Sequence, residues 1–321
     1  MLRIFRTEAE RLVELPTLDG KDAWICLIAP TEGEIKAVSE KTGVDCDYLR
    51  HSLDDEERPR IELNAHQILI IVKIPVEKKR QDAILYDTIP LGIIITKNHV
   101  VTVCLEDNPI FADLIGSQGV LYTFKRTRFL LQVLVRIAAL YLRYLRQIDK
   151  QSTELQHRLS RSMRNEELLQ LLEIQKGLVY FTTSLKANGI VMEKLLRTQL
   201  LKTTEASAGH LVKMYPEDED LLEDVITENK QAIEMSTIYS SILTDTMDAF
   251  ASLISNNLNM VMKFLASITI VLSLPTIVAS FFGMNVRLPF QNWPHAFLGI
   301  LGITVGFCGI AAYILARRRM F

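Results

Sequence analysis

Two long uncharged segments near the C-terminus constrain this chain more than any other feature of its sequence. The first runs from Phe264 to Val286 and the second from Ala296 to Ala316. Since an α-helix rises ~1.5 Å per residue, each segment can span the ~30 Å hydrocarbon core of a bilayer. A buried core helix would explain one such segment. Two in tandem predict a transmembrane hairpin with spans at about 264–286 and 296–316.

Basic residues at the ends of the two segments predict how the hairpin is oriented. Arg317, Arg318 and Arg319 follow the second segment, and Lys263 precedes the first. Positive charge is favoured on the cytoplasmic side of a membrane, and the connection 287–295 is too short to cross again. We therefore expect a multi-pass protein of the cell's inner (plasma) membrane with cytoplasmic N- and C-termini.

The composition fits a chain that is part membrane protein and part soluble domain. Mean hydropathy is +0.17 although 23% of residues are charged, and charged residues become rare after Lys263. The net charge of −2 gives no global basic surface, so we predict no nucleic-acid partner. The cysteines form no CxxC pair, and GxSxG, P-loop and HExxH motifs are missing from the sequence. We therefore expect neither an enzyme nor a resident cofactor.

The N-terminal part of the sequence reads as a mixed α/β domain. Thr31 can cap a helix that starts near Glu32 and ends near Gly43. Apolar and β-branched runs predict strands, and charged stretches between them predict loops. The predicted strands are 24–30, 68–74, 93–95 and 100–103, and the predicted polar loops are 54–60 and 77–82.

From about Thr123 onward, apolar residues recur at helical spacing. The pattern predicts long helices at 129–150, at 166–201 and from about 216 to 285. The third would be a stalk of roughly 100 Å that becomes the first span. We therefore predict an α+β membrane protein with a cytosolic α/β domain, a helical region with the stalk, and a transmembrane hairpin. Their predicted bounds are 1–122, 123–262 and 263–321.

One face of the stalk helix carries a stripe of mostly polar residues. Its members recur every three or four residues, with a mean step near 3.5, so they share one side of the helix. The stripe, which is polar except at Met262 and Ala266, consists of Ser241, Asp245, Asp248, Ser252, Asn256, Asn259, Met262, Ala266, Thr269, Ser273, Thr276 and Ser280. Helix–helix packing explains such a stripe in one interpretation, and a pore lining explains it in the other.

The pore interpretation requires several copies of the chain, because one helix supplies only one wall. In a symmetric ring each stripe residue becomes a ring of identical side chains. Asp245 and Asp248 would then form carboxylate rings suited to divalent cations. Met262 and Ala266 would form a dry constriction that gates by dewetting. Neutral oxygens would come from Asn259, Thr269, Ser273 and Thr276, with Ser280 at the outer end.

The end of the first span resembles a known family. Gly283, Met284 and Asn285 follow a long cytosolic helix and precede a second span, and Pro275 lies ten residues before Asn285. This arrangement resembles the signature of the CorA family of magnesium and other divalent-cation channels. The stretches 57–60, 96–103 and 178–181 are also similar to that family, so the resemblance covers essentially the whole chain.

The resemblance implies a homopentameric channel with a selectivity filter at Gly283, Met284 and Asn285. Mg²⁺ dehydrates reluctantly, and a ring of amides at Asn285 could accept hydrogen bonds from its water shell. The resemblance also implies that Asp248 and Asn259 face the pore. The implied partners are further copies of the chain, the lipid bilayer and divalent cations.

The resemblance further implies that intracellular Mg²⁺ regulates the channel at acidic contacts between cytosolic domains. The predicted stalk helix begins with the acidic run 217–220, followed by Glu223 and Asp224. Mg²⁺ bridging such carboxylates would hold the channel closed, and Asp224 is the predicted regulatory ligand. The alternative is a solvated acidic helix N-terminus stabilised by the helix dipole. Mg²⁺ is thus expected both as substrate and as regulatory ligand.

The sequence departs from the family pattern in the loop after the motif. Many members carry an acidic residue there, whereas this loop has none and contains Arg287. The predicted substrate is Mg²⁺, with Co²⁺ or Ni²⁺ as further ions. A zinc transporter of the related ZntB type is one alternative. A receptor or scaffold anchored by the hairpin is another, although uniformly apolar spans would suit it better.

Overall fold

The computed structural model describes residues 1–18, 20–64, 66–80, 83–116, 121–162, 165–200, 211–212, 214–284 and 295–318. The chain divides into two compact units, Met1–Thr244 and Asp245–Phe321, which are treated separately below. The predicted fold class is confirmed, with an N-terminal α/β part, a long helix and two apolar C-terminal helices. The division at residues 122 and 262 stays a prediction.

A seven-stranded mixed sheet forms the framework of the first unit. Its strand order is β2-β1-β3-β7-β6-β5-β4. All neighbouring strands pair antiparallel except β3 and β7, whose residues are all buried at the centre of the sheet. The strands are β1 Leu2–Glu8, β2 Arg11–Leu15, β3 Ala23–Ile28, β4 Arg60–Leu63, β5 Gln67–Arg80, β6 Ala83–Thr96 and β7 His99–Cys104.

The four predicted strands are found in β3, β5, β6 and β7, but the predicted loop at 77–82 is wrong for its first four residues. Glu77 pairs with Tyr86 and Lys78 with Leu85, so β5 and β6 continue as a two-stranded ribbon beyond the apolar run. Cross-strand pairing stabilises this extension, and Lys78 lies 3.4 Å from Asp87. Residues 81 and 82 lie outside the described residues.

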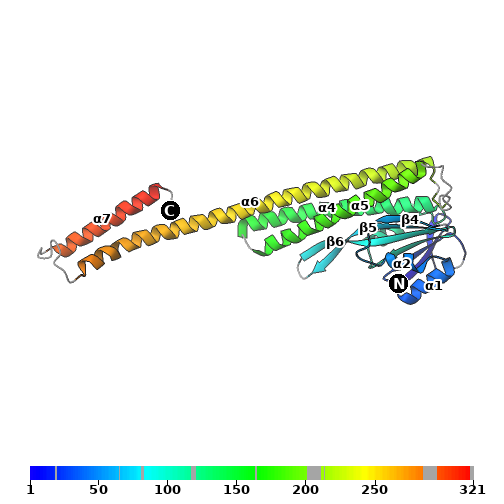
Figure 1. The fold of residues 1–321 in the computed structure, drawn as a ribbon, viewed down its shortest axis with the longest axis horizontal. Coiled ribbons are helices and arrows are strands. Elements are labelled where there is room, and N and C mark those ends of the chain that lie inside the picture. Colours follow the sequence, from blue (N-terminus) through cyan, green and yellow to red (C-terminus); the bar gives the residue numbers. More distant parts are fainter. Residues whose placement is uncertain are drawn as a thin grey trace. The chain divides into compact units, whose positions relative to one another are not determined.

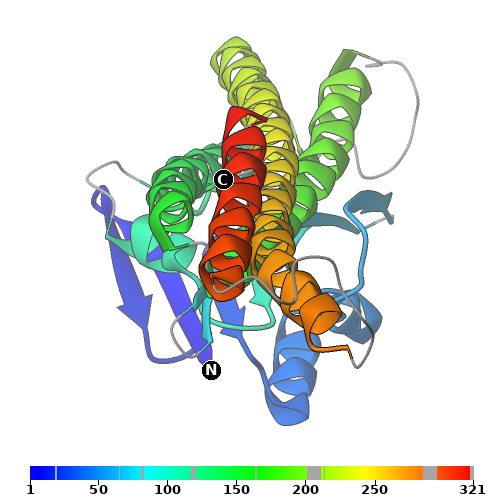
Figure 2. The same ribbon diagram turned by 90° about the vertical axis from the view of Figure 1, so that its left-hand side faces the viewer.

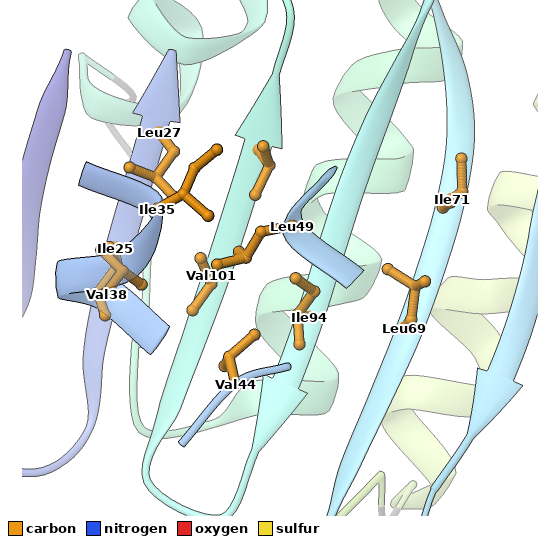
Figure 3. Close-up of a cluster of buried hydrophobic side chains, with 11 residues drawn as sticks. Ile25, Leu27, Ile35, Val38, Val44, Leu49, Leu69, Ile71, Ile94 and Val101 are labelled. Carbon is orange, nitrogen blue, oxygen red and sulfur yellow. The ribbon is translucent and has the colours of Figure 1, made fainter. Parts of the chain in front are cut away.

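Two short helices, α1 Glu32–Thr42 and α2 Cys46–His51, cover one face of the sheet. Thr31 and Glu34 form the capping box that starts α1, and Gly43 ends it with φ 74°. Ile35 and Val38 of α1 and Leu49 of α2 point into an apolar cluster on the strands (Figure 3). The strand residues of this cluster are Ile25, Leu27, Leu69, Ile71, Ile94, Val101 and Val103.

Long helices cover the opposite face. α3 Pro109–Ile115 leads into α4 Arg126–Ser162, and α5 Asn165–Leu200 returns beside it (Figures 1 and 2). Trp24 of β3 stacks on Phe5 at 4.9 Å and meets Phe129 of α4 at 5.3 Å. Its indole N–H donates to Thr102 at 2.9 Å. The aromatic group therefore fixes the start of α4 on the sheet.

A buried amide joins α5 to the sheet. Asn188 is fully buried, and its Oδ1 accepts the backbone N–H of Lys73 at 2.8 Å. Its Nδ2 donates to the carbonyl of the same residue, also at 2.8 Å. The hydroxyl of Tyr141 donates to that carbonyl at 3.0 Å. One peptide position of β5 is thereby held by both α4 and α5.

The first part of α6 Pro216–Phe282 is joined to α5 by polar side chains. Asn229 donates to the carbonyl of Leu185 at 3.0 Å, and Ser236 donates to that of Leu178 at 3.1 Å. Farther along, Gln175 donates to Thr244 at 2.8 Å. Because the buried contacts of Asn229 and Ser236 have one good register, they fix how this part of α6 lies along α5.

The second unit contains the remainder of α6 and helix α7 Ala296–Arg317. Both helices are long and apolar enough to cross a membrane, with mean hydropathies of 2.1 and 2.2 in their most apolar windows. The predicted helix from 216 to 285 is thus one helix, which ends at Phe282. The predicted second span agrees with α7 to within one residue.

We expect Gly177→Ala to destabilise the fold. A Cβ at Gly177 of α5 would lie 2.8 Å from the Cβ of Tyr86 and 3.0 Å from its carbonyl oxygen. Overpacking of this kind costs ~1–3 kcal/mol. The control is Gly33→Ala in α1, where the added carbon meets only a Thr31 oxygen at 3.9 Å. Thermal unfolding of the full chain in detergent should separate the two variants, and equal midpoints would contradict the close contact.

Lowering the pH should destabilise the first unit through His99. Burial lowers the pKa of this buried imidazole from its usual 6.5, with Asp22 opposing and Arg126 adding to the effect. The unfolded chain therefore binds the proton more readily. The free energy of unfolding should fall as the pH drops below about 6.5, by at most ~1.4 kcal/mol per pH unit for one group. In urea unfolding at several pH values, the free energy of unfolding should depend less on pH for His99→Leu than for the wild type.

Candidate functional site

The predicted polar stripe lies along α6, and all of its side chains are exposed in the single chain. Each stripe residue is exposed, from Ser241 through Asp245 and Asp248 to Ser280. Met262, one of its two apolar members, is 55% exposed. Along the described part of α6, the stripe is therefore a continuous exposed surface of one helix.

Helix α7 packs against a different side of α6. Ser267 is fully buried and Val271, Leu274 and Val278 are half-buried, whereas their neighbours on the stripe are exposed. The two helices lie beside each other in both views (Figures 1 and 2). Because successive residues of an α-helix are ~100° apart, Thr269 lies about 200° around the helix from Ser267. The stripe thus faces away from α7.

Three hydroxyls of the stripe already use their hydrogens within α6. Thr269 donates to the carbonyl of Leu265 at 2.8 Å, and Ser273 donates to that of Ile270 at 2.9 Å. Thr276 donates to Leu272 at 3.4 Å. Each hydroxyl oxygen then presents lone pairs outward, as an acceptor for water or a cation. Such bonds also satisfy hydroxyls against lipid or a neighbouring helix, so both interpretations of the stripe remain compatible with them.

Large apolar side chains flank the stripe on both sides. On one flank Leu265 and Leu272 are 56% and 66% exposed, and on the other Ile270 and Ile277 are 45% and 49% exposed. A polar stripe between two apolar flanks suits a helix whose flanks contact lipid or other helices. The stripe itself would then contact water.

The structure describes the start of the predicted filter. Gly283 and Met284 follow the last residue of α6, and their N–H groups donate to the carbonyls of Ala279 and Phe281 at 2.9 and 3.4 Å. A Cβ on Gly283 would lie 3.3 Å from the Ala279 oxygen, which is tighter than ordinary contact. Asn285 and Arg287 lie outside the described residues, so their roles stay predictions.

The acidic start of α6 contains one residue with a clear structural role. Asp218 is buried and lies 3.1 Å from Arg128 of α4. Its other oxygen accepts the backbone N–H of Tyr215 at 3.3 Å, as the third residue of a helix does when it reaches back to the N-cap. Asp224 is exposed. Among the described residues of one chain, no group of three or more His, Cys, Asp and Glu side chains is placed to hold a metal ion.

Two polar residues of the hairpin were not identified from the sequence. Ser267 lies between the helices, and Cys308 of α7 approaches the carbonyl of Val271 at 3.7 Å. The positions of α6 on this side, the buried Ser267 and the half-buried Val271, Leu274 and Val278, repeat at helical spacing. The spacing of these four residues can be read from the sequence, but the sequence does not show which side of α6 meets α7.

The fold and the exposed stripe together define a class, a two-span membrane protein with a large N-terminal α/β domain. Residues 20–318 match the family model described as "CorA-like Mg2+ transporter protein". The chain belongs to this family of membrane transporters, and the resemblance stated from the motif is confirmed.

Individual relatives agree with the family assignment. The cobalt/magnesium transport protein CorA of Methanocaldococcus jannaschii is 30% identical over 317 residues, 96% of this chain and 94% of the relative. The complete structure of the CorA magnesium transporter from that organism matches at a TM-score of 0.81 and 27% identity, over 98% of this chain and 96% of that one. These matches favour the CorA interpretation over the ZntB alternative.

The cytoplasmic domain of ZntB from Vibrio parahaemolyticus is similar in fold. It matches 78% of this chain, and 97% of its own length, with a TM-score of 0.56 and 13% identity. Identity this low shows the likeness of fold alone.

Cysteines placed on the two sides of α6 should differ in reactivity. Thr269→Cys puts a thiol on the exposed stripe, and Ser267→Cys puts one under α7. A charged thiol reagent should label the first faster by about tenfold, the ratio given by ~1.4 kcal/mol of extra cost for exposing the buried thiol. Peptide mass spectrometry of the full chain in liposomes measures both rates. Equal labelling would contradict the two-sided arrangement.

Proposed function

We propose that the chain forms a homo-oligomeric channel that conducts Mg²⁺, and also Co²⁺ or Ni²⁺, down their electrochemical gradients. The observation that carries the proposal is the oxygen-bearing stripe on the side of α6 turned away from α7. A single chain cannot enclose a path with one wall, so several copies must turn this side toward a common axis. The name of the M. jannaschii relative, a cobalt/magnesium transport protein, supports the choice of ions.

The proposed path meets the ion first at Asn285. A ring of side-chain amides accepts hydrogen bonds from water that Mg²⁺ keeps in its first shell, because this ion dehydrates reluctantly. A side chain at position 283 would crowd the Ala279 carbonyl, which glycine avoids, and Met284 is half exposed beside it. Amides are neutral, so the ion can leave again, which conduction requires.

Below the filter, the proposed path continues along the stripe. Thr276, Ser273 and Thr269 offer outward lone pairs, since their hydrogens are bound within the helix. Met262 and Ala266 would narrow the path to a dry gate, and Asn259 would follow this gate on the cytosolic side. Asp248 and Asp245 would end the path as carboxylate rings that attract divalent cations. Five copies are proposed on the family resemblance.

The proposed regulation uses acidic residues at the start of α6. Asp218 is occupied by Arg128 and by its capping role, so it is a poor candidate. Asp224 is exposed and is proposed to bind Mg²⁺ together with carboxylates of a neighbouring copy. Loss of the ion would then leave like charges facing each other and favour opening.

The proposed topology places residues 1–262 and the C-terminus in the cytoplasm, with the hairpin 263–321 in the inner (plasma) membrane. Lys263 and Arg317 at the same end of the hairpin support this orientation. Transport without catalysis is proposed, because passive flux needs no nucleotide and the sequence carries no nucleotide motif. The alternative outcome, a zinc transporter, is decided by the uptake experiment below.

Replacing the proposed filter residue should stop magnesium uptake. In proteoliposomes the wild-type chain should take up Mg²⁺ and Co²⁺ in preference to Zn²⁺. Asn285→Ala should lower Mg²⁺ uptake by about tenfold or more, because every subunit loses a hydrogen bond worth ~0.5–1.5 kcal/mol. Asn292→Ala, in the same connection, is the matched control and should leave uptake unchanged. Unaltered uptake by Asn285→Ala would remove the filter assignment, and exclusive Zn²⁺ uptake would establish the alternative.

Asp224→Ala should weaken the response to intracellular Mg²⁺. Mg²⁺ is expected to protect the cytosolic part from protease, and the variant should need about fivefold more Mg²⁺, as loss of a contact worth ~1 kcal/mol gives. Glu234→Ala, another exposed acidic position on α6, is the control. Protection curves that coincide for wild type and Asp224→Ala would rule out this residue as a sensor.

A further inference from the structure

A proline interrupts the backbone hydrogen bonding of α6 inside its apolar part. Pro275 has no N–H, so the carbonyl of Val271, four residues earlier, loses the partner that it would have in a regular helix. In a bilayer no water is available to replace that donor. Some other group must therefore satisfy this carbonyl.

Three consecutive carbonyls before the proline receive side-chain donors. The hydroxyl of Ser273 donates to the Ile270 carbonyl and that of Thr276 to the Leu272 carbonyl, both within α6. The carbonyl of Val271 receives the thiol of Cys308, with a sulfur-to-oxygen distance of 3.7 Å. Of these three donors, Cys308 alone comes from α7. The donor from the second helix thus meets the one carbonyl that the proline deprives.

The position of Cys308 on α7 allows this contact. Cys308 is half-buried on the side of α7 that also carries the half-buried Ile300, Thr304 and Leu315, at helical spacing. Thr304, one turn earlier, already donates its hydroxyl to the carbonyl of Ile300 at 2.7 Å. Cys308 is therefore the donor on this side that is directed to the partner helix.

We propose that Cys308 is a positioning residue of the conduction path. Its thiol donates to the Val271 carbonyl and so fixes α7 against α6 at the proline. Because an interior proline kinks or breaks a helix, the packing at this point would determine how Thr269, Ser273 and Thr276 are presented on the opposite side. The consequence for ion flux rests on the proposed function, whereas the hydrogen bond itself does not.

A double-mutant cycle on the full chain in detergent tests the bond. Cys308→Val keeps an apolar side chain of similar size but removes the donor, and Cys308→Ser keeps a donor. Pro275→Ala restores an N–H for Val271 from within α6. We expect Cys308→Val to lower the thermal midpoint by about 1–2 °C, the effect of one interhelical hydrogen bond, and Cys308→Ser to recover most of this loss. In the Pro275→Ala background, Cys308→Val should cause no further loss.

Thr304→Val is the matched control, because its hydroxyl bonds to its own helix. Thr304→Val should change the thermal midpoint by the same amount with Pro275 and with Pro275→Ala. Equal destabilisation by Cys308→Val with and without Pro275 would show that the thiol only packs, and would overturn the proposal. No destabilisation in either background, or a dependence of Thr304→Val on Pro275, would overturn it as well.

Uptake of Mg²⁺ by proteoliposomes tests the positioning role. Cys308→Val should lower the initial rate about threefold, the ratio expected for one interhelical hydrogen bond, and Cys308→Ser should stay near the wild-type rate. A wild-type chain that conducts no ion would refute the proposed function while the stability cycle still decides the bond. A conducting channel whose rate is indifferent to Cys308→Val would overturn the positioning role.

Discussion

The structure depends on one requirement, that every backbone polar group of α6 find a partner along its whole length. A helix meets this requirement by itself both in water and in lipid. The single helix Pro216–Phe282 therefore needs no change of structure where charged sequence gives way to apolar sequence. The one interior residue that violates the requirement is Pro275, and side-chain donors surround the carbonyls just before it.

Along this helix the kind of partner changes with the surroundings. In the first unit, Asn229, Ser236 and Thr244 join α6 to α5 through hydrogen bonds that allow one register. In the second unit, one side packs on α7 through small and apolar residues, and the opposite side keeps its oxygens exposed. The first arrangement fixes the helix, and the second leaves an exposed surface that the proposed channel would enclose with further copies of the chain.

Much of the fold could be predicted because its signals are local. The capping box at Thr31 and Glu34, the glycine at 43 and the two apolar spans each depend on a few neighbouring residues. The stripe also depends only on helical periodicity. The selectivity filter was predicted from a motif, and Asn285, the residue predicted to contact the ion's water shell, lies outside the described residues.

The features that could not be predicted depend on contacts between distant residues. The ribbon at 77–80 is stabilised by pairing with β6, which overrides its polar composition. Strands β1 and β2 carry weak alternation and form because β1 pairs with β3. Likewise, no local signal could show that Cys308 lies opposite Val271, since 37 residues separate them.

The contact between Asn188 and Lys73 has a consequence for how the molecule avoids unwanted association. The outermost strand β4 stops pairing at Ile71, so β5 would beyond that point offer a free donor and acceptor to any foreign strand. The side-chain amide of Asn188 bonds both the backbone N–H and the carbonyl of Lys73. The ammonium of Lys194 donates to the Ile61 carbonyl on β4 itself at 3.3 Å. Side chains of α5 thus close this margin of the sheet against edge-to-edge aggregation.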